Sequence, residues 1–372
     1  ILLGSTTASV QPDANVSSCN YNTINLNTAA GFDTFGIWSR LASATSDKFL
    51  NNNIITIQNT TTTPIASRFM RGIWQDGNLR LLTISENTVT LSYENANNDH
   101  TVNFIQADIT TASSRIINGN ILKTPSGGSL RTSGAINGIS HSGISSGLLN
   151  INQNTIEIDK GNVSSAANFF GISSVSTSNA SSYEINFNNI SLTASSGVNA
   201  NTTIRGISNI DGSVTLNKTI SSNIVAINSN NNGGTTGGIY LERTGIATIT
   251  NNAVTVSNFS SVLYGIFLNT SCTTNNLSNN NITISPTNLA VSVSISGITN
   301  SVGTANFINN LITLAPQIST TATITVTITG ISNSTANGNI NNNASILIAP
   351  QTTSNSGVVN FTSIGISNFG SN

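Results

Sequence analysis

The stretch Thr203-Ile204-Arg205-Gly206-Ile207-Ser208 contains the feature that decides the fold, the dipeptide Gly-Ile. This pair recurs at intervals of 27 to 36 residues along most of the 372-residue chain. Its copies are Gly36-Ile37, Gly72-Ile73, Gly138-Ile139, Gly171-Ile172, Gly206-Ile207, Gly238-Ile239, Gly265-Ile266, Gly297-Ile298, Gly330-Ile331 and Gly365-Ile366, with Phe104-Ile105 in phase in the one wide gap. A period of this length is typical of a solenoid, in which each repeat buries its apolar face against its neighbours.

A second motif, Asn-x-apolar-x-apolar, keeps the same period. Alternation of apolar and polar residues, as in Asn53-Ile54-Ile55-Thr56-Ile57, indicates a strand with one buried face. Copies begin at Asn22, Asn53, Asn87, Asn154, Asn188, Asn223, Asn252, Asn280 and Asn310, with weaker copies at Asn120 and Ala344. A third, weaker strand lies between the two motifs, for example at 213–216 and 303–307.

Three short strands per repeat predict an all-β fold, a right-handed parallel β-helix of about eleven coils of roughly 33 residues. We expect an N-terminal cap or leading segment at 1–21 and the repeat domain at 22–372. Helix is a poor alternative, because Asn, Ser, Thr and Gly dominate and all four disfavour helix interiors.

Asparagine accounts for 60 of the 372 residues. An Asn at the same corner of each coil lies about 4.8 Å from the next, so its amide can donate to one neighbouring coil and accept from the other. Asn also tolerates the left-handed backbone that tight corners require. We therefore predict a buried structural ladder of Asn154, Asn188, Asn223, Asn252, Asn280 and Asn310.

The residue two positions before Gly is usually apolar as well, as Ile204 is before Gly206. Positions −2 and +1 relative to Gly cannot both face inward on a regular strand with a period of two. A corner or bulge at Gly resolves this conflict, because Gly fits such a backbone at low cost. The motif therefore has a packing explanation that needs no active site.

Charge is sparse and unevenly distributed. Charged residues make up 7% of the chain, the net charge is −1, and from Thr244 to Asn372 there is no Asp, Glu, Lys, Arg or His. We expect no binding to nucleic acid and no membrane insertion, since no general positive charge and no apolar run of about 18 residues exists. A neutral amide and hydroxyl surface suits an extracellular fibre or a face buried against another subunit. Because the chain starts at Ile1 without a leader, we expect a processed form or a piece of a longer protein.

The sequence offers little support for catalysis. Glu157 and Asp159 are predicted to project outward together, but Lys123 occupies the Glu157 slot one coil earlier, so a cross-strand ion pair is the simpler interpretation. No clustering of acids on adjacent coils is apparent, and His100 and His141 lack metal-ligand spacing. We expect no enzyme, no metal and no cofactor. Cys19 and Cys272 lie seven coils apart, about 34 Å, so they are not expected to pair.

Aromatic residues are the best candidates for recognition. Trp38, Trp74, Tyr240 and Phe267 each follow the Ile of a Gly-Ile pair, and stacking in register places them outside on adjacent coils. Exposed aromatic planes bind sugars or anchor an interface, and a mutual aromatic ladder that stabilises the stack is the alternative. An ice-binding face is a third hypothesis, but its Thr323–Thr329 array is one coil deep.

The Gly-Ile and Asn-x-Ile-x-Leu repeats resemble the parallel β-helical repeats of very large secreted surface proteins, such as those that gliding or predatory Bacteroidota export by the type IX system. The resemblance covers Asn22 to Phe369 and implies an extracellular, cell-surface adhesin or filament module. Its expected partners are identical copies or further chain of the same protein, with surface glycans as additional candidates. The alternative function is a carbohydrate-binding or polysaccharide-cleaving β-helix protein.

Overall fold

The computed structural model describes residues 2–3, 16–28, 33–40, 45–60, 68–94, 100–109, 114–143, 147–161, 167–175, 182–195, 202–210, 217–230, 234–242, 244–269, 272–287, 289, 291–334, 338–341, 345–352 and 357–368. These residues form strands and connections, and none of them lies in a helix. Three long sheets hold almost all the strands, and every strand pair within them is parallel. The predicted parallel β-solenoid is confirmed.

Sheet A carries the Gly-Ile motif and has twelve strands. They are β1 (Leu2–Leu3), β4 (Thr34–Arg40), β7 (Phe69–Asp76), β10 (Thr101–Ile109), β13 (Ile136–Gly143), β16 (Phe169–Val175), β19 (Thr203–Ile210), β22 (Thr235–Glu242), β25 (Val262–Leu268), β28 (Val293–Asn300), β32 (Ile324–Asn333) and β36 (Val359–Asn368).

Sheet B has eleven strands. They are β2 (Val16–Ser18), β5 (Asp47–Asn51), β8 (Leu81–Ser85), β11 (Ser114–Asn118), β14 (Leu148–Asn152), β17 (Ser182–Asn186), β20 (Lys218–Ser221), β23 (Thr244–Thr250), β26 (Cys272–Ser278), β29 (Thr304–Ile308) and β33 (Gly338–Asn341).

Sheet C carries the Asn motif and also has eleven strands. They are β3 (Thr23–Thr28), β6 (Ile54–Asn59), β9 (Thr88–Tyr93), β12 (Ile121–Lys123), β15 (Thr155–Lys160), β18 (Asn189–Ala194), β21 (Ile224–Asn230), β24 (Ala253–Phe259), β27 (Asn281–Ser285), β30 (Leu311–Leu314) and β34 (Ser345–Ile348). A small fourth sheet pairs β31 (Gln317–Ile318) with β35 (Gln351–Thr352).

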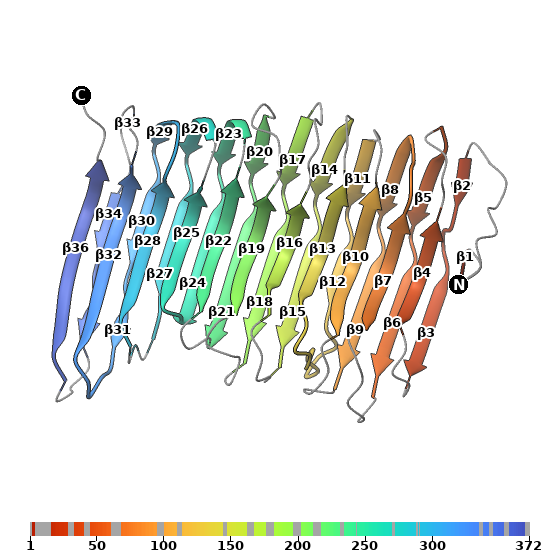
Figure 1. Ribbon diagram of the computed structural model, residues 1–372, viewed down its shortest axis with the longest axis horizontal. Coiled ribbons are helices and arrows are strands. Elements are labelled where there is room, and N and C mark those ends of the chain that lie inside the picture. The colour runs from red at the N-terminus through yellow and green to blue at the C-terminus, as the bar shows by residue number, and fades with distance from the viewer. Residues whose placement is uncertain are drawn as a thin grey trace.

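Each coil runs through one strand of sheet A, then one of sheet B, then one of sheet C, and the coils stack along the long axis of the molecule (Figure 1). The weak third strand of the sequence pattern is the sheet B strand. The stretch expected at 303–307 is found as β29, whereas the one expected at 213–216 lies outside the described residues, and β20 at Lys218–Ser221 is the sheet B strand of that coil. Much of the segment at 1–21 is also outside them, but β1 and β2 already belong to sheets A and B.

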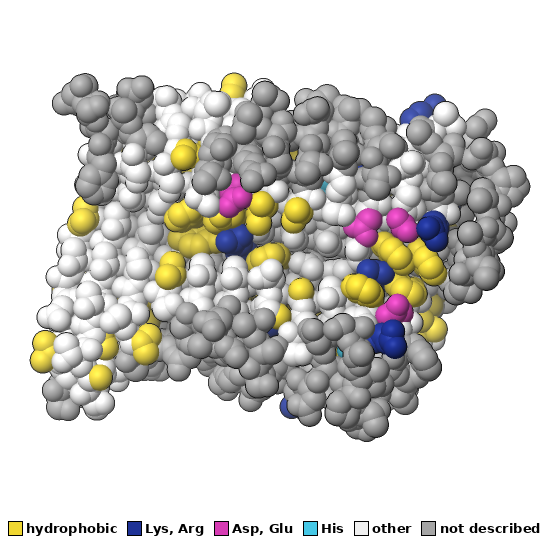
Figure 2. Space-filling model, in the orientation of Figure 1, with side chains coloured by type: hydrophobic (Ala, Val, Ile, Leu, Met, Phe, Trp, Pro, Cys, Tyr) yellow, Lys and Arg dark blue, Asp and Glu magenta, His cyan; other side chains and the backbone are white. Residues whose placement is uncertain are grey.

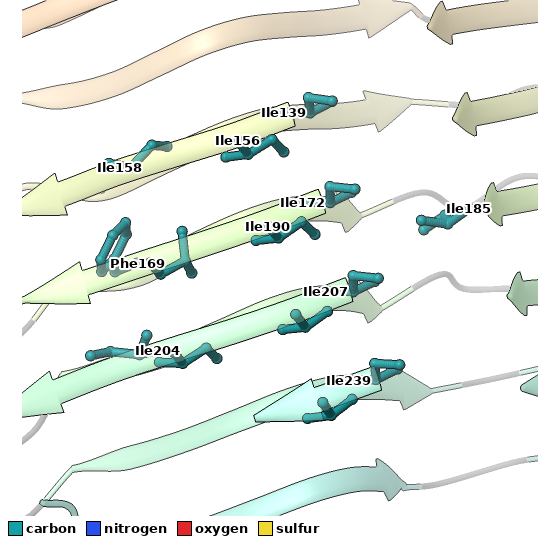
Figure 3. Close-up of a cluster of buried hydrophobic side chains, with 14 of the residues drawn as sticks. Ile139, Ile156, Ile158, Phe169, Ile172, Ile185, Ile190, Ile204, Ile207 and Ile239 are labelled. Carbon is teal, nitrogen blue, oxygen red and sulfur yellow. The ribbon is translucent and has the colours of Figure 1, made fainter. Parts of the chain in front are cut away.

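The core is a set of columns in which equivalent side chains stack from coil to coil (Figure 3). Ile139, Ile172 and Ile207 are consecutive partners in sheet A, and all three are fully buried. Ile156, Ile190 and Val225 are consecutive partners in sheet C, at most 1% exposed. Both inward columns predicted from the two motifs are therefore confirmed.

The glycines of the Gly-Ile motif are needed for space. Between neighbouring sheet A strands the regular pairing omits the Gly, as from Phe170–Arg205 to Ile172–Ile207. A Cβ on Gly171 would lie 2.6 Å from the Gly206 carbonyl oxygen and 2.6 Å from Ile190 Cγ2. None of the motif glycines has a positive φ, so close approach of backbone and a sheet C side chain is the reason for Gly.

The coil of β10, β11 and β12, which has no Gly at this position, supports the packing argument. Phe104 takes its place and is fully buried. In the same coil Leu122 replaces the β-branched residue that other coils place in that sheet C column, such as Val89 and Ile156 on either side. A branched Cβ crowds this position and Leu relieves it, so the Phe-Leu pair substitutes for the usual Gly-Ile or Gly-Val pair.

Candidate functional site

A ladder of buried asparagines runs along the corner between sheets B and C. Ten residues form it, with each Nδ2 donating to the Oδ1 of the next at 2.9–3.0 Å. They are Asn22, Asn53, Asn87, Asn120, Asn154, Asn188, Asn223, Asn252, Asn280 and Asn310. From Asn53 onward each is at most 1% exposed, as the sequence predicts, and Asn120, a weaker copy by sequence, is a full member.

Each ladder amide between the two ends of the ladder joins three coils. The Nδ2 of Asn188 donates to Asn223 Oδ1 at 2.9 Å in the following coil and to the Ile151 carbonyl at 2.8 Å in the preceding one. Its Oδ1 accepts from both the backbone N and the Nδ2 of Asn154, each at 3.0 Å. Charge-neutral amides thus satisfy buried backbone groups at a corner where the sheet ladder is interrupted.

The left-handed backbone at this corner belongs to the residue before the ladder Asn. Positive φ values of 52° to 59° occur at Tyr21, Asn52, Glu86, Gln153, Phe187, Ser222, Asn251, Asn279 and Asn309. Asn is present at four of these nine positions, so asparagine does take the left-handed backbone at this corner, one residue before the ladder. The physical reason is that a ladder amide must point inward, whereas the left-handed residue turns its side chain toward solvent.

The outer face of sheet A carries two clusters of aromatic residues (Figure 2). In the first, the rings of Trp38 and Trp74 stack with centroids 4.8 Å apart and planes 12° apart, and Phe35 lies 5.4 Å from Trp74. The guanidinium of Arg71 lies 4.0 Å from the Trp74 ring centroid and 4.1 Å from that of Phe69. Sequence alone placed the two tryptophans together. Phe35 and Arg71 each precede a motif Gly and lie on this outer face against the tryptophan rings, and Arg71 also contacts Phe69.

Three carboxylates surround Arg71. Burial lowers the pKa of Arg71, and the charges of Asp108, Asp33 and Asp76 act against that shift. The sequence interpretation that no acids cluster on adjacent coils is therefore wrong here, because the sheet A register puts Asp76 beside Asp108, a pairing hidden by their separation in sequence. Burial is the main cause that raises the pKa of Asp76, with a further contribution from Asp108.

These acids already have partners within the cluster. Asp108 accepts hydrogen bonds from Trp74 Nε1 at 3.0 Å and from Ser142 Oγ at 2.6 Å. Asp76 lies 3.6 Å from Arg40 Nε, and Asp33 accepts from the Phe69 backbone N. Such an arrangement fixes the tryptophans in place. It also presents a rim of carboxylate, guanidinium and indole groups to any polar ligand.

The second cluster lies five coils further along the same face. Tyr240 and Phe267 stack with centroids 5.7 Å apart, and the Arg205 guanidinium lies 3.4 Å from the Tyr240 ring centroid. Tyr240 is 8% exposed, so it is more buried than its predicted outward position suggests. Burial raises the pKa of its neighbour Tyr264 to about 12.

The two clusters do not form one site. Each predicted pair is brought together, but coils lined by polar residues such as Asn137 and Ser173 separate them. In both clusters the rings pack against each other and against an arginine side chain. Of the two interpretations that the sequence left open, this geometry favours the stabilising aromatic ladder.

The remaining sequence candidates are scattered. Lys123 and Glu157 are direct neighbours in sheet C, as predicted, but both are exposed and they form no ion pair. The prediction of a pair there is wrong because solvent screens charges on an open face. His141 is buried, with Nδ1 3.0 Å from Ser174 Oγ, and burial holds its pKa well below the usual value.

Three buried lysines were missed by sequence reasoning, and two of them, Lys160 and Lys218, are at most 1% exposed. Lys218 Nζ donates to Asn209 Oδ1 at 2.5 Å and to the Glu242 carbonyl at 3.0 Å. Lys160 is fully buried, its Nζ has no hydrogen-bond partner among the described residues, and burial lowers its pKa to about 8. The signal for Lys160 was available, because it continues the inward alternation of Ile156 and Ile158.

No protein-family profile, no curated protein and no solved structure matches this chain. Within the described part of the chain, no three His, Cys, Asp or Glu residues are grouped so that they could hold a metal ion. Cys19 and Cys272 are both buried and free, as expected. The same described residues include no helix of the length and apolarity needed to cross a membrane.

Proposed function

We propose that this chain is a rigid, non-catalytic structural module of an extracellular filament, stalk or cell-surface adhesin. The observation that carries the proposal is the continuous Asn ladder, which links ten successive coils by buried side-chain hydrogen bonds. Together with three unbroken parallel sheets, it couples each coil to the next and resists bending and local opening. Stiffness along one axis is the property that a stalk or filament requires.

The neutral surface gives further support for an exposed structural role. From Thr244 onward no residue carries a formal charge, and outward positions hold Thr, Ser and Asn, as at Thr255, Thr283 and Thr313. Amide and hydroxyl side chains remain hydrated without charge repulsion, so such coils can lie close to other copies or to a cell wall.

Immunogold labelling of intact cells that produce the chain tests the proposal. We expect label on the cell surface or on extracellular fibres without permeabilisation. Label that appears only after permeabilisation refutes the proposal, and so does turnover of a polysaccharide by the purified protein.

Carbohydrate binding is the second candidate function, and the Trp38–Trp74 cluster is the observation that favours it. Aromatic rings next to Asp76, Asp108 and Arg71 combine stacking surface with hydrogen-bonding groups, as sugar sites do. A glycan array with the whole chain tests this function. Trp74→Ala is the test variant and should abolish glycan binding. Phe267→Ala, which removes a ring from the other aromatic cluster, is the matched control and should leave binding unchanged.

A further inference from the structure

We propose that His141 and Arg115 form an acid-sensitive latch at the corner between sheets A and B, and that this corner opens locally when His141 takes up a proton. The inference goes beyond the proposed structural role, because it adds a response to pH that a uniformly rigid module does not have. It starts from two buried ionisable side chains that meet in the core of two successive coils.

His141 lies in the inward column of β13 next to sheet B, and it is 1% exposed. From Ser39 onward, the other residues that pair along this column all have uncharged side chains. They are Ser39, Gln75, Ala107, Ser174, Asn209, Leu241, Leu268, Asn300, Asn333 and Asn368. Among these described members of the column, His141 is therefore the residue that can gain a charge near neutral pH.

Arg115 enters the same corner from sheet B of the preceding coil. It occupies the inward column of β11, is fully buried, and donates through Nη1 to the Ser142 carbonyl at 3.2 Å. Ser142 directly follows His141, so the guanidinium reaches across the corner to the strand that carries the imidazole. Burial is the main cause that lowers the pKa of His141, and the charge of Arg115 is the second.

The sheet A neighbours of His141 bring no charge into the core. Ala107 of β10 and Ser174 of β16 flank it in the column. The Ser174 hydroxyl lies 3.0 Å from His141 Nδ1, whereas His141 Nε2 is buried with no hydrogen-bond partner among the described residues. The carboxylate of Asp108 lies on the outer face of β10, where it accepts a hydrogen bond from Ser142 Oγ.

The sheet B side of the corner adds no balancing charge either. Leu149 and Tyr183 follow Arg115 in its column, and they are an apolar and a neutral phenolic side chain. The chain segments that follow β10, β13 and β16 contain no ionisable residue, and these segments are 110–113, 144–147 and 176–181. A proton on His141 would therefore add a second positive charge next to Arg115, without a carboxylate to balance it among the described residues that act on His141.

Protonation of His141 is costly while the corner is closed. Two adjacent positive charges repel each other more strongly in the core than in water, and the imidazolium loses its hydration there. Water reaches both groups when β11 and β13 separate at the corner, so the opened state accepts the proton readily. Because each coil of a solenoid contacts mainly its neighbours, the opening stays local to these coils.

The direction of the pH dependence follows from the two states of His141. Its pKa is lowered in the closed corner, whereas in the opened corner it has the ordinary value of about 6.5. Below about pH 6.5 the opened state therefore binds more protons, and its population rises about tenfold for each further pH unit until the closed state is protonated as well. The closed corner is thus most stable above about pH 7 and loses stability in acid.

Hydrogen exchange of the whole chain, read by mass spectrometry and corrected for the intrinsic rate at each pH, tests the inference. We expect the protection of β11 and β13 to fall about tenfold between pH 7.5 and pH 5.5, while β24 and β27, several coils away, keep theirs. His141→Asn is the test variant and should abolish this fall. The column accepts the substitution, because Asn209 and Asn300 occupy it in other coils and are fully buried.

Two further variants separate the charge from the packing. Arg115→Leu removes the repelling charge, and Leu82 and Leu149 on either side show that the column accepts Leu; the fall should level off at a higher pH than in the wild type. Ser174→Ala is the matched control, because it removes the hydrogen bond to His141 without removing a titrating group. It should lower protection at both pH values and leave the tenfold ratio unchanged.

Protection of β11 and β13 that is independent of pH in the wild type would overturn the inference. A fall that persists in His141→Asn would also overturn it, and so would a fall of equal size in every coil. If His141→Asn does not fold at pH 7.5, His141→Gln takes its place as the test variant, since Gln75 occupies the same column and is fully buried.

Discussion

Replacing Asn188 by Ala removes the centre of the Asn ladder. The substitution deletes the hydrogen bonds from Asn188 Nδ2 to Asn223 Oδ1 and the Ile151 carbonyl, and the two that Asn154 donates to Asn188 Oδ1. The Asn154 side chain keeps another acceptor, the Ile117 carbonyl, but its buried backbone N loses the acceptor it had.

The expected destabilisation follows from the groups left without partners. A buried polar group without a partner costs about 1–3 kcal/mol, and Asn188→Ala affects the Asn154 backbone N and the Ile151 carbonyl. Including the small void that remains, we expect a loss of about 2–4 kcal/mol in the free energy of unfolding. Asn189→Ala is the matched control: Asn189 is the exposed next residue, and its replacement should change stability by less than about 0.5 kcal/mol.

Urea unfolding followed by circular dichroism measures the loss, and amide hydrogen exchange locates it. We expect the Asn154 amide to lose protection while amides several coils away keep theirs, because a solenoid transmits a defect mainly to its neighbours. An unchanged unfolding midpoint together with unchanged exchange at Asn154 would refute the view that the ladder stabilises the stack.

Three further predictions concern packing, charge and thiols. Gly171→Ala should destabilise the fold by about 2 kcal/mol or more in urea unfolding, because the added Cβ would overlap backbone and a side chain. Gly365→Ala is the control and should be close to neutral, since its Cβ would have open space. Equal effects of the two substitutions would contradict the close-packing role of Gly171. Lys160 has a folded-state pKa lowered to about 8, below its unfolded value, so the unfolded state binds more protons between about pH 8 and 10.5 and stability should rise with pH across that window. Lys160→Met should remove this rise and add up to about 3 kcal/mol at pH 7, and a pH profile unchanged by the substitution would show that Lys160 is not the group responsible. Cys19 and Cys272 should both react with a thiol reagent only after unfolding, since both are buried and burial raises the pKa of Cys19; fast labelling of the native protein would contradict this.

The contrast between confirmed and corrected predictions has a consistent cause. The Ile column that contains Ile172 and the Asn ladder that contains Asn188 were predictable because every coil of a solenoid has the same environment at these positions. The same residue type therefore recurs in the sequence once per coil. The acids around Arg71 were not, because Asp33, Asp76 and Asp108 occur once each and meet only when the register of sheet A is known.

The sequence by itself determined the architecture. The period of about 33 residues and the two motifs predicted three strands per coil, the inward columns and the ladder, since each depends on local alternation and one repeated spacing. Only the tertiary structure decided that close approach of Ile190 accounts for Gly171, and that the residue before each ladder Asn takes the left-handed turn. These features depend on how strands of different sheets contact each other in space. The repeat pattern of a sequence does not specify the distance between a residue in one sheet and a residue in another.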